Sequence, residues 1–330
     1  AAHAEVGAPL LMPAPAPPPP PPRKASPPSP PPPPPKKYPT SLRAELVVGI
    51  AHTATFAYRR ATLALIRATL TDYTLVVACD TRGAIDAPLP EACDVASDGL
   101  GDARNDLVHM ARLAGATHLV VLDDDVLIRP ADIEALRAAM VVAHPEFDLL
   151  SGVYAGEEAL VHTLLFDERT MTMEPVEDLD LEPTKPKSAD LAHNAFLVKL
   201  DALDALPWDA RAKMEEHLLF FVKLKLRGKR VGVLPSVALD HRPMPKTDPE
   251  FKAYEARRHA EPEHLGLLCL NLPKLLAFVT PWARVDCLAK TVTLPMQDNA
   301  ARPLTKWWTG TADDEKDPAS TLPGMPVSTS

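Results

Sequence analysis

The segment His118-Leu-Val-Val-Leu-Asp-Asp-Asp125 decides how the rest of the chain is interpreted. Its first five residues are a short apolar run with two valines, which predicts a strand buried on both faces. Three consecutive carboxylates follow. Side chains two positions apart in an extended segment face the same way, so Asp123 and Asp125 are expected to share one face. The segment therefore predicts a buried strand that carries an acidic cluster to the edge of a sheet.

Strands and helices alternate on both sides of this segment. Apolar runs predict strands, and apolar residues at helical spacing predict helices. The strands are Ala44–Ile50, Thr74–Cys79, Phe147–Tyr154, Asn194–Val198 and Arg230–Leu234, and the helices are Ala57–Thr71, Arg104–Leu113, Pro130–Met140 and Met214–Arg227. This order is typical of an α/β protein with a mostly parallel sheet covered by helices on both faces. The polar, proline-punctuated residues Glu174–Asp190 predict a loop.

Polar residues follow the first three strands of the predicted sheet: His52 and Thr53, then Asp80, then the Asp triplet. Ligands of such sheets bind beyond the carboxyl ends of the strands. These side chains are therefore expected to converge on one ligand site.

Proline divides the chain into two parts. Of 38 prolines, 18 lie in residues 1–40, which cannot build a core because polyproline lacks backbone donors. We expect a disordered stem at 1–40, a folded domain at 41–245, and an extension at 246–330 whose last part is disordered. The stem carries a charge of +3, so the net charge of −9 leaves −12 on the body. An acidic body without a basic stripe argues against nucleic acid as a partner, and no apolar stretch is long enough for a membrane helix.

The four cysteines (Cys79, Cys93, Cys269 and Cys287) form no CxxC pair, which argues against a structural zinc site. Two disulfides remain open if the compartment oxidises.

The Asp triplet has two interpretations. Adjacent carboxylates raise one another's pKa unless a positive charge lies between them, and Mg²⁺ or Mn²⁺ would provide that charge. Alternatively, the triplet is a solvated turn in which Asp125 or Asp132 caps the next helix.

Four motifs surround the triplet: Ala103-Arg104-Asn105 at a helix start, the strand ending in Asp-x-Asp, Glu215-Glu216-His217 before Phe220-Phe221, and the late His241. In this order they resemble the motifs of GT-A glycosyltransferases, particularly family-2-type enzymes, and the domain at 41–245 would then be the catalytic domain. The block from Trp208 to Phe221 is most similar to ganglioside N-acetylgalactosaminyltransferases. The resemblance covers residues 44–243 and implies a GT-A fold with an inverting, metal-dependent hexosyl- or N-acetylhexosaminyltransferase activity. A UDP-sugar would be the donor, and a glycan, lipid or protein hydroxyl the acceptor.

The resemblance also implies roles for individual residues. Asp125, Asp123 and His241 would hold Mn²⁺ or Mg²⁺, while Asp124 would lie near the ribose. Asp80 would accept from uracil, with Thr53 and Arg104 lining the nucleotide pocket. Glu216 would be the general base, and Glu215 or a Glu216–His217 couple is the alternative.

Two further hypotheses stay open. The chain is either an active transferase or a non-catalytic GT-A-like protein, and its proline-rich arm also resembles cell-wall stalks and ligands of SH3 or WW domains. The stem resembles that of lumenal transferases, which implies the Golgi lumen or secretory pathway with an N-terminal anchor removed upstream. A cytoplasmic location is the alternative.

Overall fold

The structure is a computed structural model of the 330-residue chain. The whole predicted stem, residues 1–40, lies outside the described residues. The structure describes residues 44–53, 57–81, 89–154, 162–166, 171–175, 182–204, 207–210, 216–245, 247–249, 252, 277–279, 284–286, 291–293 and 301–303. Within these ranges no helix has the length and apolar character needed to span a bilayer. The predicted domain boundaries at 40 and 245 stay predictions.

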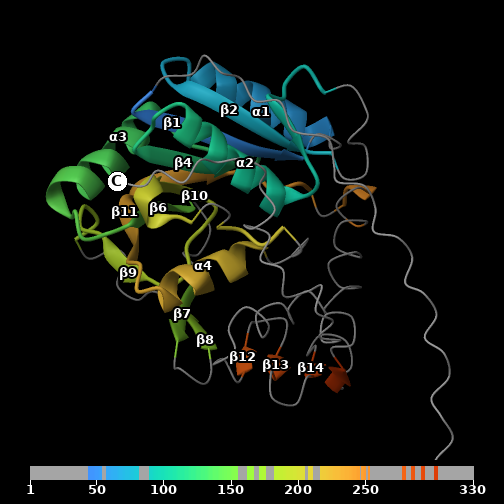
Figure 1. Cartoon of the computed structure of the whole chain (residues 1–330), viewed down its shortest axis with the longest axis vertical. Helices are drawn as coiled ribbons and strands as arrows, with labels where there is room; N and C mark the ends of the chain where they lie inside the picture. The colour runs from blue at the N-terminus through green and yellow to red at the C-terminus, as the bar shows by residue number, and fades with distance from the viewer. Residues whose placement is uncertain are drawn as a thin grey trace, which may run out of the picture. The chain divides into compact units, whose positions relative to one another are not determined.

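The first half of the central sheet is parallel. Its strands β3 (Val95–Ser97), β2 (Thr74–Asp80), β1 (Leu46–Thr53) and β4 (His118–Asp123) lie in that order. Helices α1 (Ala57–Thr69) and α2 (Leu100–Leu113) are the intervening helices (Figure 1). This half confirms the predicted alternation of strands and helices.

Beyond β4 the sheet is mixed. Strand β10 (Ala195–Lys199) lies antiparallel between β4 and β6 (Leu149–Tyr154). Strand β11 (Val231–His241) then pairs parallel with β6 and antiparallel with β5 (Val126–Leu127) and β9 (Lys187–Ala189). The prediction of a loop at Glu174–Asp190 missed β9 and the end of strand β8 (Met171–Pro175). The predicted strand Arg230–Leu234 was too short, since β11 continues to His241 after a shift in register.

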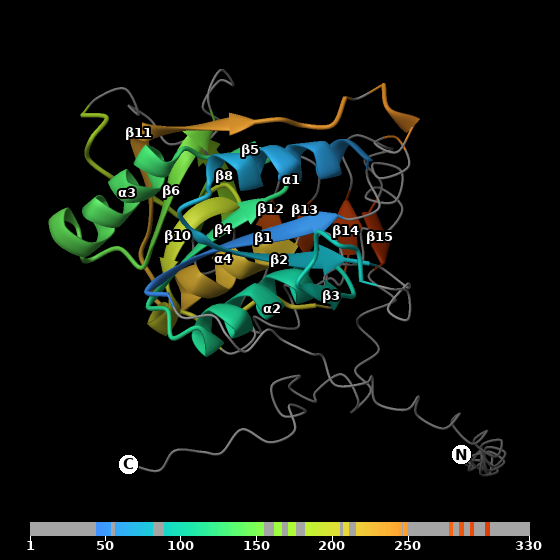
Figure 2. The same cartoon turned by 90° about the horizontal axis from the view of Figure 1, so that it is seen from above.

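Alternate strand residues supply two cores, one on each face of the sheet. In β4, Leu119 and Val121 pack with α2 and α4 (Glu216–Leu226), while Val120 and Leu122 pack with α1 and α3 (Pro130–Ala138). Figure 2 shows these two helix pairs on opposite sides of the sheet. Two-sided burial explains why the strands are continuous apolar runs rather than alternating ones.

The connecting segments contain a π-helical turn at Ala139–Ala143, a 3₁₀ turn at Leu200–Ala202 and two further sheets. These sheets are β7 (His162–Phe166) with β8 (Met171–Pro175), and β12 (Ala277–Val279), β13 (Arg284–Asp286), β14 (Thr291–Thr293) and β15 (Ala301–Pro303).

Gly152 in β6 lies at a close approach between β6 and β11. A Cβ added there would lie 2.6 Å from the carbonyl oxygen of Val237. Only glycine lets the two backbones approach this closely, and the approach coincides with the bulge that bends β11 toward β5.

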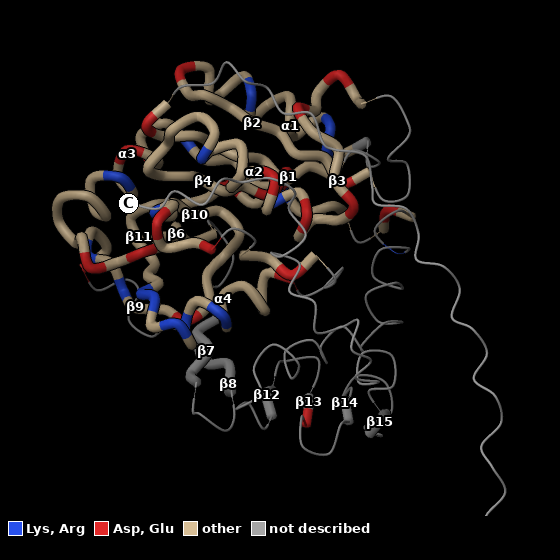
Figure 3. Tube along the Cα trace, in the orientation of Figure 1, with Lys and Arg blue, Asp and Glu red and all other residues tan. Residues whose placement is uncertain are grey.

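Basic positions gather around β9 and the end of α4 (Figure 3). Several of them are paired: Lys225 with Asp190, at 2.5 Å, and Arg227 with Asp204. The basic residues of this region are therefore partly neutralised.

Candidate active site

The carboxyl ends of β1, β2 and β4 lie together, as the sequence predicted. Thr53 is in register with Asp80, and Ala51 is in register with Asp123. The polar residues that follow the three strands therefore meet at one edge of the sheet.

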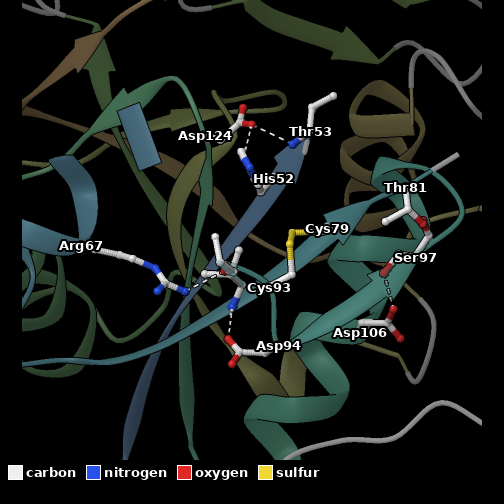
Figure 4. The surroundings of a disulfide bond; sticks show 12 residues. His52, Thr53, Arg67, Cys79, Thr81, Cys93, Asp94, Ser97, Asp106 and Asp124 are labelled. Atoms are coloured by element: carbon white, nitrogen blue, oxygen red, sulfur yellow. Dashed lines mark hydrogen bonds and ion pairs between the residues drawn. A yellow bond between two sulfur atoms is a disulfide. The ribbon is translucent and has the colours of Figure 1, made fainter. Parts of the chain in front are cut away.

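Asp124 is bound to the end of β1. Its Oδ2 accepts a 2.7 Å hydrogen bond from the backbone N–H of Thr53 and lies 2.8 Å from Nδ1 of His52 (Figure 4). Its Oδ1 lies 3.1 Å from Nη1 of Arg59. Both oxygens of this buried carboxylate therefore have partners, and Asp124 joins the ends of two neighbouring strands.

Asp125 lies between helix α1 and strand β11. Its Oδ2 contacts Nη1 of Arg59 and lies 3.5 Å from Nε2 of His241. The pairing of His241 with Val126 across β11 and β5 places the imidazole there, and the backbone N–H of Arg242 donates to the Asp125 carbonyl at 2.7 Å. Although burial alone would raise it, the pKa of Asp125 is lowered by His241 and Arg59.

Arg104 connects Asp123 to Glu216. Its Nη2 donates to Asp123 Oδ1 and its Nη1 to Glu216 Oε1, each at 2.6 Å, and the arginine side chain is 1% exposed. Burial would raise the pKa of Glu216, but Arg104 and His217 lower it, so Glu216 is ionised at neutral pH. For Asp123 burial prevails over Arg104 and the pKa is raised, with Asp125 and Asp124 adding to the effect. A single guanidinium thus holds the acidic strand end against the start of α4.

The charges in this cluster do not cancel. With all four carboxylates ionised and the histidines neutral, Asp123, Asp124, Asp125 and Glu216 contribute a formal charge of −4 and Arg59 and Arg104 contribute +2, which leaves −2. A residual charge of −2 is what one divalent cation would neutralise.

The donor set suits such a cation in part. Within the described ranges no three His, Cys, Asp or Glu side chains are gathered as a ready metal site. However, Asp125 and His241 place a carboxylate oxygen and an imidazole nitrogen 3.5 Å apart, and both atom types suit Mn²⁺. Mg²⁺ and related ions usually take one or two protein carboxylates and complete their coordination with substrate phosphates and water. The pair therefore fits an open metal site, whereas Asp123 is held by Arg104.

The positions of α2 and α4 are set by a buried polar and aromatic cluster. The side-chain amide of Asn105 donates to the backbone carbonyl of Trp208 at 2.8 Å and accepts from the backbone N–H of Trp208 at 3.0 Å. The Trp208 ring stacks on Phe220, with centroids 4.2 Å apart. These contacts hold the start of α4, and so Glu216, near the Asp triplet.

Asp80 is buried beside β3, where Thr81 donates to the Ser97 carbonyl and Ser97 Oγ donates to Asp106 at 2.5 Å. A disulfide joins Cys79 to Cys93 next to this group (Figure 4). Cys269 and Cys287 lie outside the described residues. Thus one of the two disulfides that the sequence allowed is present, at the end of β2, the strand that carries Asp80.

Some functional candidates were missed from the sequence. Arg59 was not singled out, and neither was the stack in which Tyr154 packs against His193 and His241, with centroids 3.7 and 4.2 Å apart. A basic residue in the first turn of the helix after β1 was the available signal for Arg59. Of the predicted bases, His217 is half-buried and Glu215 lies outside the described residues.

No protein-family model matches the chain, and no curated protein matches it. It is similar in structure to GalNAc-T7 crystallised with UDP, GalNAc and Mn²⁺, at 15% identity over 62% of this chain and 44% of that one, with a TM-score of 0.43. It is also similar to Staphylococcus aureus TarS 1–349, at 15% identity, 69% and 64% coverage, and a TM-score of 0.41. A second TarS structure gives 14% identity, 68% and 43% coverage, and a TM-score of 0.39.

The chain thus spans less than two thirds of each of these proteins. At such identities and TM-scores the likeness carries no residue's role from those proteins to this chain. The α/β class is evident from the sheet and its flanking helices. The finer resemblance to ganglioside N-acetylgalactosaminyltransferases stays a prediction.

Proposed function

We propose that the chain is a metal-dependent GT-A glycosyltransferase that transfers a sugar from a UDP-sugar to a hydroxyl acceptor with inversion. The observation that supports this most is the gathering of four carboxylates around two arginines at the carboxyl edge of the sheet, with −2 left over. Ligands of open α/β sheets bind at this edge. The −2 would attract a divalent cation, and that cation would in turn bind the diphosphate of a nucleotide sugar.

Asp125 and His241 would hold Mn²⁺ or Mg²⁺. When bound, this ion would stabilise the charge that develops on the leaving diphosphate. Asp80 and Thr53 would line the nucleoside pocket, since their backbones are adjacent in the register of β1 and β2. Asp124 would lie near the ribose, as the resemblance implies, with its own oxygens bound to His52, Thr53 and Arg59.

Glu216 would accept the proton of the acceptor hydroxyl. As the hydroxyl oxygen bonds to the anomeric carbon, the bond from that carbon to the phosphate oxygen breaks, and UDP leaves with the electron pair. Arg104 keeps Glu216 ionised and orients it through Oε1. The metal-held diphosphate and the base would then lie on opposite sides of the sugar, as inversion requires.

A second function has a specific observation in its favour. Glu216 is only 5% exposed and ion-paired, which suits a structural role in a protein that binds a nucleotide sugar without turning it over. Binding without turnover would identify this case.

The test uses the full chain with a panel of UDP- and GDP-sugars and Mn²⁺, measuring nucleotide release and transfer. We expect release from a UDP-sugar, with loss of about 10²–10⁴-fold in Glu216→Gln, the range of a general base. Asp125→Asn should also lose activity, whereas Glu134→Gln, an exposed helical glutamate on α3, should not. Activity unchanged in both site variants would contradict the assignment.

We also propose a location in the secretory pathway. The Cys79–Cys93 disulfide supports it, because such bonds persist in oxidising compartments. Labelling of free thiols in protein from its native cells would test this, and a reduced Cys79 would favour the cytoplasm.

A further inference from the structure

Arg59 occupies the carboxylate that a metal ion would need. It projects from the first turn of α1, and its Nη1 contacts Asp124 Oδ1 and Asp125 Oδ2 together. Asp125 Oδ2 is also the atom that faces His241. A cation binding between Asp125 and His241 must therefore compete with Arg59 for the same oxygen.

We propose that Arg59 is the resident counter-ion of Asp124 and Asp125 in the metal-free site. When a divalent cation binds Asp125, Arg59 gives up that carboxylate and donates instead to the diphosphate of a nucleotide. This inference rests on the proposed function, because it assigns a phosphate-binding and metal-responsive residue to the same site.

The two arginines of the site differ in their freedom to do this. Arg104 is almost fully buried, and its two terminal nitrogens are bound to separate carboxylates at 2.6 Å. Arg59 is 17% exposed and uses one terminal nitrogen for both of its carboxylates. Arg59 can therefore leave Asp125 while its helix stays in place.

Arg59 also has donor capacity to spare. Its Nε is buried and has no hydrogen-bond partner among the described residues. A guanidinium carries five N–H donors in a planar fork that suits phosphate oxygens. An anion arriving with the metal ion would supply the acceptors that this side chain lacks, and such charge-assisted bonds are strong.

Electrostatics makes the exchange reciprocal. Two positive charges on one carboxylate repel each other, so Arg59 weakens cation binding in the absence of nucleotide. When a diphosphate is present, its negative charge lies between Arg59 and the metal ion. The metal ion and the nucleotide then each increase the affinity for the other. The expected behaviour is weak binding of the metal alone and tighter binding of metal and nucleotide together.

The experiment measures Mn²⁺ binding to the nucleotide-free full chain by the electron paramagnetic resonance signal of free Mn²⁺. Wild type is compared with Arg59→Gln and with Arg60→Gln, which removes the same charge from the exposed next residue of α1. We expect Arg59→Gln to bind Mn²⁺ about tenfold more tightly than wild type, and Arg60→Gln to match wild type. Mn²⁺ affinity in Arg59→Gln equal to or below that of wild type would overturn the proposal.

A second measurement titrates UDP into each protein at saturating Mn²⁺. We expect Arg59→Gln to bind UDP about tenfold more weakly, because a charge-assisted contact is lost. Unchanged UDP affinity would overturn the phosphate-binding role. A purely structural role would not move the two affinities in opposite directions.

Two features keep the test decisive. If Arg59→Gln does not fold by circular dichroism, Arg59→Lys replaces it, with the same directions expected at smaller size, since an ammonium lacks the planar fork. Failure of the proposed function is recognised separately, because it appears as absence of UDP binding and turnover in wild type. The Mn²⁺ affinity ratio between variant and wild type does not depend on either.

Discussion

Replacing Arg104 with methionine should destabilise the protein strongly. The side chain is almost fully buried and is the hydrogen-bond partner of both Asp123 and Glu216. Methionine fills a comparable volume without a charge, so the main effect is to leave the buried Glu216 and the half-buried Asp123 without their cation. The lost ion pairs, rather than a cavity, should dominate the change in unfolding free energy.

The magnitude follows from the contacts. Removing one partner of a buried ion pair typically costs about 3–5 kcal/mol. Two pairs are broken here, but each stranded carboxylate can escape its penalty by binding a proton. That escape costs about 1.4 kcal/mol for every pH unit between the ordinary pKa near 4 and the working pH, or about 4 kcal/mol per group at pH 7. Glu216 accounts for about 4 kcal/mol of this, and Asp123 adds less because its side chain is 26% exposed and its pKa is already raised in wild type. We therefore expect a total loss of about 4–6 kcal/mol, a large part of the usual 5–15 kcal/mol of a domain.

The pH dependence carries the sharper test. In the variant the folded pKa of Glu216 should lie above its unfolded value, so its contribution to stability is lost as pH rises. The pKa of Asp123 is already raised in wild type, and loss of Arg104 should raise it further. In wild type the pKa of Glu216 is lowered, and its contribution is lost as pH falls. The gap between wild type and variant should therefore widen from pH 5 to pH 8, as measured by urea unfolding.

A matched control lies on the same helix. Arg112 donates to the carbonyls of Leu200 and Leu203 rather than to carboxylates, so Arg112→Met should cost about 1–3 kcal/mol with no pH dependence in this range. The triple change Arg104→Met with Asp123→Asn and Glu216→Gln should recover most of the loss, since it leaves no unpaired charge. A cost below about 1 kcal/mol, flat with pH, would refute this account of Arg104.

Three other outcomes can be measured in the same way. Gly152→Ala should lower the free energy of unfolding by about 2–3 kcal/mol, because its Cβ would lie 2.6 Å from a carbonyl oxygen of β11. Gly115→Ala, which has open space around it and a φ of 75°, should cost only about 1–2 kcal/mol, and equal losses would contradict the close approach. Reducing the Cys79–Cys93 bond, which closes a separation of 14 residues, should remove about 3 kcal/mol and lower the melting temperature. The double alanine variant at these two positions should lose this part of the response to reductant, and an undiminished response would contradict the assignment. Because the pKa of Glu216 is lowered from 4.5, its contribution to stability is present above that pH and is lost as the pH falls further. Urea unfolding of Glu216→Gln should therefore show a smaller loss of stability than wild type between pH 5 and pH 3, and an identical loss would contradict the shift.

Much of the fold was predictable because the strands are buried on both faces. Leu119–Leu122 and the runs in β1 and β2 are continuous apolar segments. Leu63 and Ile66 of α1 are buried, as is Leu70 directly after it, and all three lie in the predicted helix Ala57–Thr71. The convergence of Thr53, Asp80 and the Asp triplet also followed, since it depends only on parallel strands ending at the same edge.

The remaining features depend on contacts between distant segments, which no local pattern encodes. The antiparallel insertion of β10 between β4 and β6 follows from register across the sheet. The extension of β11 to His241 depends on a shift in register between Val233 and Ala238. Pro235-Ser236 lies in this shift, and a Pro-Ser pair does not by itself predict that a strand continues. Arg59 was missed for the same reason: a basic residue in the first turn of a helix is usually solvated, and only the neighbouring strand ends bury it.

The placement of β10 has a consequence for how the chain is synthesised. Asp123 donates its backbone N–H to the carbonyl of Asn194, and β4 gains its second neighbour only when β10 has been made. A nascent chain released after Tyr154 would contain Arg59, Arg104 and all three aspartates, yet it would present β4 as an open edge available to other chains. The fragment would lack Glu216, which pairs with Arg104, and His241, which faces Asp125, because α4 and β11 come later. Premature termination should therefore yield an aggregating fragment rather than a small active domain, and completion of the acidic cluster would be among the last events of folding.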